Sequence, residues 1–381
     1  MTEYIVILLL LIYGAYKELT IKGYKNKVLF YLLFIVMWLY SGLRYRVGTD
    51  SFMYANIFDY FPSIDALNLK NIFNYNMEPL WILYNSILKY ICDDFIIVQL
   101  VSSFILNLAV FKFIKHNSNY IFITLTLYFF IDYLLMNFEF MRQTTALGFY
   151  YLFVHNLYEK RKIKFWVFGI ILLTFMHNTI IFCSLIPIIQ KIKFSKKIIF
   201  IVLSICAFIV LSNQVFNIIS YFVPTSLSAT EKIRAYQNDV LTIYSFNFFI
   251  VKFYTFFIVL FCILYDKNSK YMGVMLLYLI ILALTATHDI FDRLHYCLFL
   301  FYYIVYSEVI VKILKRTPKV LFLFLLFLIN IPQIIYLNHN YEGNLYVYNK
   351  FFPYYSYLNP NICHEREMMN KGEEQMNFIF K

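Results

Sequence analysis

Residues 95–138 have the sequence FIIVQLVSSFILNLAVFKFIKHNSNYIFITLTLYFFIDYLLMNF, in which two apolar runs flank a short basic cluster. The runs cover about residues 95–114 and 120–138, and Lys112 and Lys115 lie near their junction. Each run is close to the ~20 residues that a helix needs to cross the hydrocarbon core of a bilayer. Because cytoplasmic loops of membrane proteins are rich in Lys and Arg, this stretch predicts two spanning helices joined on the cytoplasmic side.

The same pattern continues along the whole chain. Further apolar runs lie near 3–18, 28–43, 143–158, 165–177, 179–192, 198–220, 246–265, 271–287, 294–312 and 320–338. Hydrophobic residues make up 61% of the 381 residues, charged residues make up 14%, and the mean hydropathy is +0.65. A soluble domain of this length could not cover so much apolar surface, so the sequence predicts an all-α polytopic membrane protein with roughly 12 transmembrane helices. No repeat or linker divides it, and we expect one membrane domain, 1–338, and a polar tail, 339–381.

Charge and cysteine usage exclude several classes of protein. The formal net charge is +11, but the basic residues fall into short clusters between apolar runs, as the positive-inside rule requires, so no nucleic-acid partner is expected. The six cysteines form no CxxC pair and mostly lie inside apolar runs. They indicate small core residues rather than a zinc site or a disulfide framework, and we expect neither a metal nor a cofactor.

The basic clusters also predict the orientation of the chain. The cytoplasmic loops should be 17–27, 112–119, 159–164, 191–197, 266–270 and 312–319. These loops share one side only if segment 79–91 does not cross, so we interpret it as a re-entrant or surface-lying helix; its ~20 Å length is short for a span. By the same reasoning, 165–192 is a hairpin of two short helices with His177 and Asn178 at its tip.

The loops assigned to the outer side carry an unusual set of polar residues. Their motifs are Arg44-Tyr-Arg46-Val-Gly48-Thr-Asp50, Glu78-Pro79, Glu139-Phe-Met-Arg142-Gln143, His177-Asn178 and His288-Asp289-Ile-Phe-Asp292-Arg293. Ionisable groups at membrane depth are costly and usually face a protein-lined cavity, which makes them functional candidates. A guanidinium matches phosphate oxygens and stays charged, so several arginines at the outer rim suit a pyrophosphate whose lipid tail stays in the bilayer.

We therefore expect two groups of site residues. The group that binds the pyrophosphate and the glycan comprises Arg44, Arg46, Arg142, Gln143, Asp292 and Arg293. The catalytic candidates, of which a carboxylate or a neutral imidazole can take a proton from a sugar hydroxyl, are Asp50, Glu78 and His177. The arginines would stabilise the charge that develops on the leaving pyrophosphate, a role that needs no metal.

Each of these residues also has a structural interpretation. Asp50 could cap a helix Ser51–Phe61, and Glu78 could only begin the helix 79–91. Arg44 and Arg46 could be interfacial anchors, while Arg142 could pair with Glu139 and Arg293 with Asp289. His177 could hydrogen-bond across its own turn. Tyr54 and Tyr296 are expected to be packing residues.

Taken together, these motifs resemble the EpsG family of Wzy-type bacterial polysaccharide polymerases. The resemblance covers about residues 1–335 and is most specific at 44–50, followed by Tyr54. It implies a GT-C-like, multi-pass enzyme of the bacterial inner membrane with a periplasmic active site, in which Asp50 is the important carboxylate of the first external loop. It also implies that a glycan moves from undecaprenyl pyrophosphate to the next lipid-linked repeat unit of an O-antigen, capsule or exopolysaccharide, and that a chain-length regulator is a partner.

Two other functions fit parts of the same pattern. An O-antigen ligase would use similar arginines with a lipid A core acceptor, but ligases usually have an external domain larger than 221–245. A flippase for lipid-linked oligosaccharides would place its charges at mid-membrane depth in both halves of the chain. Here the charges are predicted at one rim, which favours the polymerase.

Overall fold

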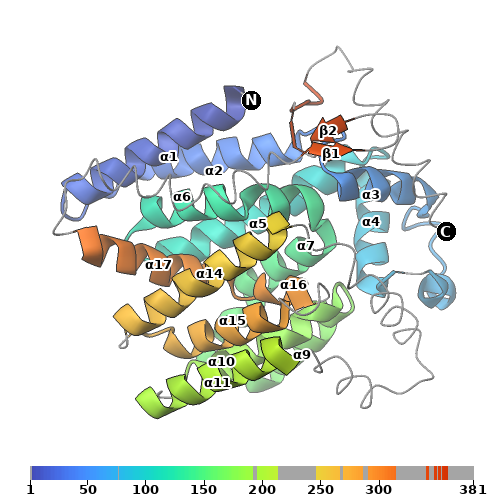
Figure 1. Cartoon of the computed structure of the whole chain (residues 1–381). Helices are drawn as coiled ribbons and strands as arrows, with labels where there is room; N and C mark the ends of the chain where they lie inside the picture. Colours follow the sequence, from blue (N-terminus) through green and yellow to red (C-terminus); the bar gives the residue numbers. More distant parts are fainter. Residues whose placement is uncertain are drawn as a thin grey trace. The chain divides into compact units, whose positions relative to one another are not determined.

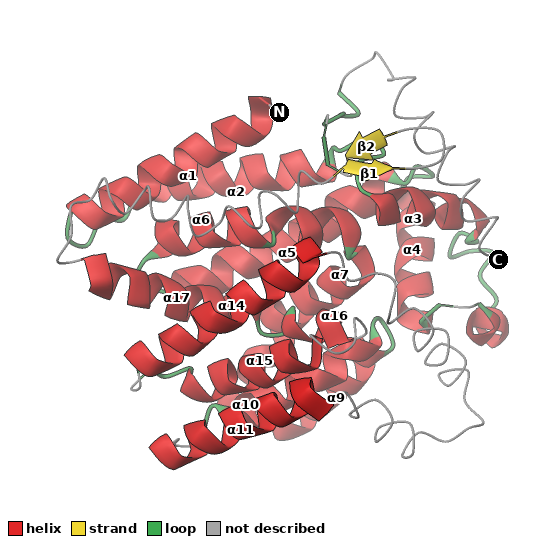
Figure 2. Cartoon of the chain, viewed as in Figure 1, coloured by secondary structure: helices red, strands yellow, loops and turns green. Residues whose placement is uncertain are grey.

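The computed structural model describes residues 2–75, 77–191, 195–212, 246–266, 269–285, 291–314, 340–342, 347–349, 351–352 and 354–358. Their regular structure is helical, apart from one antiparallel hairpin of β1 (Asn340–Glu342) and β2 (Val347–Asn349) (Figure 2). The chain divides into two compact units, Met1–Ile181 with Thr317–Lys381, and Phe182–Arg316. The all-α prediction is confirmed for the described residues.

The first unit contains most of the helices that carry candidate site residues. They are α1 (Thr2–Thr20), α2 (Lys27–Gly42), α3 (Thr49–Tyr60), η1 (Leu69–Asn74), α4 (Pro79–Ile91), α5 (Ile96–Asn117), α6 (Ile121–Ile131), η2 (Leu135–Glu139), α7 (Met141–Phe149), η3 (Tyr150–Val154), α8 (His155–Glu159) and α9 (Ile163–Thr174). The segments α7, η3 and α8 follow one another almost without interruption, with π-helical geometry in η3.

The long helices of this unit pack side by side around α5. Helix α5 contacts α2, α6 and α7, and α1 contacts α2 and α6 (Figure 1). The approach of α5 to α7 requires a small residue, since a Cβ on Gly148 would lie 2.7 Å from Ile105 Cγ2. Helix α4 crosses the ends of the long helices, and its bounds match the short helix predicted at 79–91 (Figure 1). This is the arrangement expected of a helix that does not span.

The second unit is also built from apolar helices. It contains α10 (Ile186–Ile189), α11 (Lys196–Ser212), α14 (Phe246–Tyr265), α15 (Met272–Thr285), α16 (Asp292–His295) and α17 (Phe299–Leu314), and η4 (Asn178–Leu185) leads into it from the first unit. Helix α15 contacts α11, α14 and α17. The predicted span at 320–338 and the loop 221–245 lie outside the described residues.

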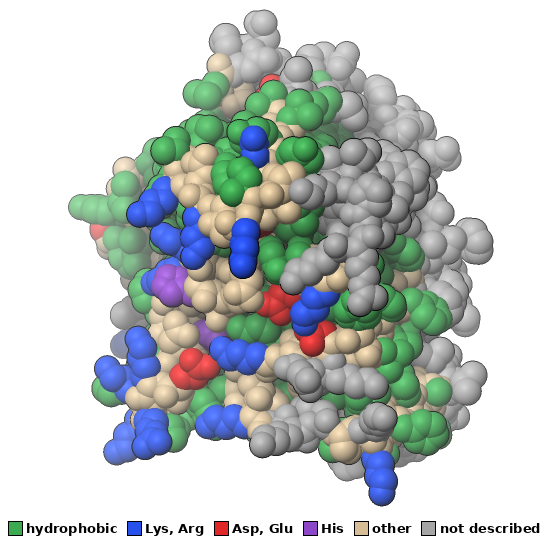
Figure 3. All heavy atoms as spheres, turned by 90° about the vertical axis from the view of Figure 1, so that its left-hand side faces the viewer, with side chains coloured by type: hydrophobic (Ala, Val, Ile, Leu, Met, Phe, Trp, Pro, Cys, Tyr) green, Lys and Arg blue, Asp and Glu red, His purple; other side chains and the backbone are tan. Residues whose placement is uncertain are grey.

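Length and apolarity of the helices agree with a membrane protein. Among the described residues, α5 has the length and composition needed to cross a bilayer, and several other apolar helices have 10–17 residues. Of the basic loops predicted for one side, 17–27, 112–119 and 159–164 lie at one end of the first unit, where exposed Lys and Arg side chains gather (Figure 3). These side chains belong to Lys22, Lys25, Lys27, Lys112, Lys115, Lys160, Arg161, Lys162 and Lys164. The opposite end of α2 leads into the Arg44–Asp50 loop, and α3 and α4 lie at that end of the long helices (Figure 1).

Candidate active site

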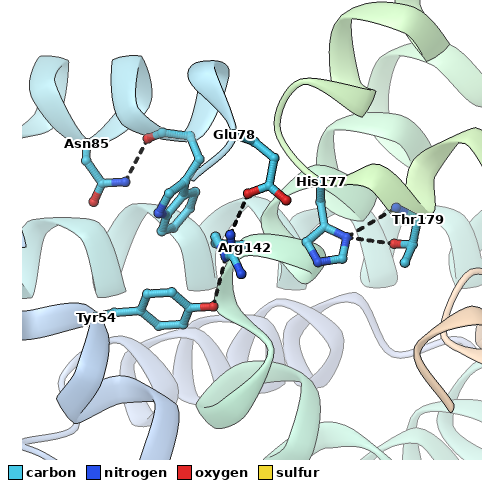
Figure 4. Close-up of polar contacts among 7 residues, drawn as sticks. Tyr54, Glu78, Asn85, Arg142, His177 and Thr179 are labelled. Carbon is cyan, nitrogen blue, oxygen red and sulfur yellow. Dashed lines mark hydrogen bonds and ion pairs between the residues drawn. The ribbon is translucent and has the colours of Figure 1, made fainter. Parts of the chain in front are cut away.

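Arg142 is the centre of a polar cluster in the first unit. It lies in the first turn of α7, and its guanidinium donates hydrogen bonds to two other helices (Figure 4). Nη1 donates to Glu78 Oε2 at 2.5 Å, and Nε donates to the Tyr54 hydroxyl at 3.1 Å. The exposed fractions of the Arg142 and Glu78 side chains are 18% and 17%, so water screens this ion pair only partly. Three segments far apart in the sequence therefore meet at one guanidinium.

Local sequence explains how Glu78 reaches this position. Pro79 follows it as the first residue of α4, a position where the fixed φ of proline favours helix initiation. Glu78 is the N-cap residue, but its side chain makes no capping hydrogen bond. The carboxylate instead extends to Arg142, so Glu78 does more than begin the helix. The neighbouring Trp81 is 1% exposed, and its ring packs edge-on against Tyr54 at 5.8 Å.

His177 lies beside the Arg142–Glu78 pair (Figure 4). A hydrogen bond from the Leu80 amide to the Phe175 carbonyl, 2.9 Å long, joins the start of α4 to the end of α9 and brings His177 near Glu78. The imidazole is 5% exposed, and its Nδ1 lies 2.8 Å from Thr179 Oγ1 and 3.4 Å from the Thr179 amide nitrogen. An amide can only donate, so Nδ1 is the acceptor, and in a neutral ring Nε2 carries the proton.

The loop before α3 is fixed against η2. Gly48 has φ +95°, and a Cβ there would lie 2.7 Å from the Phe138 carbonyl oxygen, so this position needs glycine. The Asp50 amide donates to Glu139 Oε2 at 3.3 Å. Glu139 thus lies at the N-terminus of α3, where the helix dipole favours a carboxylate.

This arrangement corrects two of the structural alternatives. The helix begins at Thr49 rather than Ser51, and its N-cap residue is Gly48, which has no side chain, so the capping interpretation of Asp50 is wrong. Arg142 pairs with Glu78 and not with Glu139. The carboxylates of Glu78 and Asp50 both act electrostatically on the Arg142 guanidinium.

The two arginines of the loop differ in environment. Arg44 is 0% exposed, its Nη1 donates to the Ser41 carbonyl, and its guanidinium carbon lies 5.0 Å from the centre of the Phe138 ring. Burial lowers the pKa of Arg44 to about 10, so the group stays charged at neutral pH. Arg46 is partly exposed, has φ +49°, and lies 5.5 Å above the Tyr45 ring. Gln143 is 2% exposed in α7.

Asp292 and Arg293 belong to the second unit. Asp292 Oδ1 lies 3.3 Å from His295 Nδ1, and the Arg293 side chain is exposed. His288 and Asp289, including the proposed Asp289–Arg293 pair, lie outside the described residues. The participation of Asp292 and Arg293 in the same site as Arg142 stays a prediction.

Tyr54 and Glu139 contribute to the site in ways the sequence did not predict. Tyr54 was expected to be a packing residue, yet its hydroxyl accepts the Arg142 Nε hydrogen. The spacing in the sequence could have indicated this role, because Tyr54 follows Asp50 by four residues and therefore lies on the same face of α3. Nothing in the sequence connects Glu139 with the start of α3, because the two segments are 89 residues apart.

The cluster has the chemistry needed to bind an anion and move a proton. A guanidinium has five N–H donors, and Tyr54 and Glu78 engage two of them. Among the residues that the structure describes, 5 − 2 = 3 donors of Arg142 therefore remain for a ligand. Phosphate oxygens are suitable acceptors for such a fork. The carboxylates of Glu78 and Asp50 and the imidazole of His177 lie near the Arg142 guanidinium, so a bound phosphoester would have groups beside it that can accept or donate a proton.

Comparison with known families identifies a match over most of the chain. The family model of the EpsG family matches residues 27–356, which begins and ends later than the resemblance expected over about 1–335. The chain matches no curated protein and no solved structure. The match and the apolar helices together indicate a membrane protein.

Proposed function

This chain belongs to the EpsG family, the family of Wzy-type polysaccharide polymerases, and from that premise we propose how it acts. The protein is a glycosyltransferase that transfers a growing glycan from undecaprenyl pyrophosphate to the next lipid-linked repeat unit. The transfer takes place on the periplasmic face of the inner membrane, in a GT-C-like fold of roughly 12 spans. The observation that carries the proposal is the position of the Arg142 guanidinium. Tyr54 and Glu78 hold it through two hydrogen bonds, and its remaining N–H groups can bind a phosphate.

The reaction exchanges one bond at the anomeric carbon of the donor. A hydroxyl of the acceptor sugar attacks this carbon, the new glycosidic C–O bond forms, and the C–O bond to the pyrophosphate breaks. The hydroxyl proton passes to a carboxylate, and the electron pair of the broken bond stays on the pyrophosphate. Positively charged donors that meet this developing charge stabilise the transition state.

The site residues divide into two roles in this proposal. Arg142 binds the pyrophosphate, and the Nε2–H of His177 adds a neutral donor, since its Nδ1 accepts from Thr179. Asp50, the carboxylate of the first external loop, acts electrostatically on Arg142 and accepts the proton in this proposal. Glu78 holds the Arg142 guanidinium through a direct ion pair. Both roles are performed by side chains, so the mechanism is metal-independent.

The substrates follow from this chemistry. Undecaprenyl-pyrophosphate-linked oligosaccharides serve as donor and acceptor, and the lipid tails remain in the bilayer. A chain-length regulator is the expected protein partner. Arg44, Arg46, Gln143, Asp292 and Arg293 are the remaining candidates for contacts with the pyrophosphate and the glycan.

The decisive experiment is deletion of the gene, followed by gel electrophoresis of the surface polysaccharide. We expect the ladder of long chains to vanish while single repeat units are still transferred to their final acceptor. Loss of the single-unit band as well would instead indicate a ligase or a flippase. Complementation with Arg142→Ala should fail, and complementation with Lys164→Ala, which removes an exposed cation at the other end of the unit, should restore the ladder.

A further inference from the structure

A segment of the C-terminal tail pairs with the loop that bears Arg44. We name Tyr354–Leu358 the C-terminal strap. The Tyr45 amide donates to the Tyr355 carbonyl at 2.8 Å, and the Tyr357 amide donates to the Leu43 carbonyl at 2.9 Å. Arg44 and Ser356 are the opposed residues of this antiparallel bridge. The strap therefore adds a short strand to the loop edge through main-chain bonds, the mode by which peptides extend exposed strands.

Aromatic side chains strengthen the attachment. The Tyr354 ring stacks on Tyr40 at 4.3 Å, and its hydroxyl donates to the Tyr40 carbonyl at 2.8 Å. The Tyr357 ring meets the Tyr45 ring edge-on at 5.1 Å. These contacts involve only the strap, the end of α2 and the loop, so they can open without disturbing the contact between Gly48 and η2.

The strap covers a charged group whose hydrogen bonds are incomplete. Arg44 is 0% exposed, and its Nε and Nη2 contact no acceptor among the described residues. A buried donor without an acceptor carries its full desolvation penalty, and the penalty is larger for a charged group. An anion that reached these two nitrogens would remove that penalty, which gives it a binding advantage at this position.

We infer that the strap is a removable cover over a second phosphate-binding group, Arg44, which binds the pyrophosphate of the lipid carrier when the strap lifts. This inference rests on the proposed function. Arg44 and Arg142 are connected through two carboxylates: Glu139 acts on Arg44 and accepts from the Asp50 amide, and Asp50 acts on Arg142. Each guanidinium thus interacts with one carboxylate of this acidic pair, Arg44 with Glu139 and Arg142 with Asp50, and lifting the strap extends the phosphate site from Arg142 towards the loop.

A reversible cross-link tests whether the strap must move. Residues 45 and 355 are opposed in the register set by Arg44 and Ser356, and hydrogen-bonded antiparallel pairs have Cα atoms about 5.5 Å apart, within the range of disulfides. Tyr45→Cys and Tyr355→Cys are combined in a background with Cys92→Ser and Cys363→Ser, where the other four cysteines are buried. Polymerisation of lipid-linked repeat units is measured before and after oxidation, and again after dithiothreitol.

We expect oxidation to lower the polymerisation rate of the double variant at least tenfold and dithiothreitol to restore it. The Tyr45→Cys and Tyr355→Cys single variants, treated in the same way, should not respond to oxidation. Equal rates for the oxidised and reduced double variant would overturn the inference and make the strap a fixed part of the loop.

Binding of inorganic pyrophosphate to the detergent-solubilised protein gives a second readout that does not depend on polymerisation. The oxidised double variant should bind pyrophosphate at least tenfold more weakly than the reduced double variant. When Arg44→Gln is added to the double variant, both the oxidised and the reduced protein should bind pyrophosphate as weakly as the oxidised double variant. If the double variant binds pyrophosphate with this dependence but neither it nor the wild-type protein polymerises repeat units, the proposed function fails and the strap inference survives. Redox-independent pyrophosphate binding would overturn the strap inference alone.

Discussion

Replacing Arg142 with lysine should abolish most of the activity although the positive charge is kept. The guanidinium must serve Glu78, Tyr54 and a phosphate at the same time, through separate nitrogens with fixed directions. A lysine ammonium has three donors at one atom. It can keep the ion pair with Glu78 or turn to the phosphate, but it cannot bridge both and remain bonded to Tyr54.

The expected magnitude follows from the hydrogen bond that is lost. A hydrogen bond to a charged group contributes about 1.5–3 kcal/mol. Each 1.36 kcal/mol lost from transition-state stabilisation lowers a rate tenfold, so the loss of one phosphate contact lowers the rate roughly 10- to 150-fold. The Arg142 and Glu78 side chains are only 18% and 17% exposed, which limits compensation by water.

The assay is the initial rate of chain elongation in membrane vesicles supplied with lipid-linked repeat units, with products separated by length. Arg161→Lys is the matched control, because Arg161 is exposed and lies at the opposite end of the first unit. We expect Arg161→Lys to match the wild type. An Arg142→Lys protein that inserts normally and elongates chains within twofold of the wild-type rate would refute the proposal that a planar fork binds the phosphate.

Three further outcomes are expected. Tyr54→Phe removes the acceptor of the Arg142 Nε hydrogen and should lower the elongation rate by about tenfold or more, whereas Tyr84→Phe, which removes a hydrogen bond to Ser102, should not. His177→Gln keeps an N–H near the position of Nε2 and should be at least tenfold more active than His177→Asn; equal loss in both would contradict the donor role. Gly48→Ala should lower the thermal unfolding midpoint, at a cost of about 1–3 kcal/mol, by more than Gly23→Ala, which has positive φ but nothing within 4 Å of a Cβ.

The lengths of the apolar runs and the positions of the basic clusters predicted where many of the described helices lie, because both patterns are local. Segment 79–91 shows this most clearly: a Pro at its start, a short apolar run and two following aspartates predicted a separate short helix, and α4 has those bounds. The turn at His177 was also expected, and its hydrogen bond to Thr179 is one that the sequence allowed. The run 179–192, predicted as one short helix, instead forms the 3-10 segment η4 and the four-residue helix α10.

The partners of the candidate site residues were harder to predict, because they depend on contacts between distant segments. Arg142 has a carboxylate three residues before it, Glu139, and local spacing favoured that pair. The fold instead turns Glu139 towards the start of α3 and brings Glu78 to Arg142 across 64 residues. Likewise, the strap pairs with residues more than 300 positions earlier, and a polar tail gives no periodic signal for such a bridge.

Arg44 and Arg142 have opposite electrostatic environments, and this difference affects how each of them can bind a phosphate. Arg142 has a direct carboxylate partner and so remains stable without substrate, but an incoming phosphate must compete with Glu78. Two nitrogens of Arg44 have no acceptor within the described part of the chain, so an incoming phosphate displaces no anion from them but must first move the strap. A diphosphate has two phosphoryl groups and can meet both conditions at once. The proposed function therefore predicts selectivity for a diphosphate over a monophosphate, because a single phosphoryl group gains from only one of the two arginines.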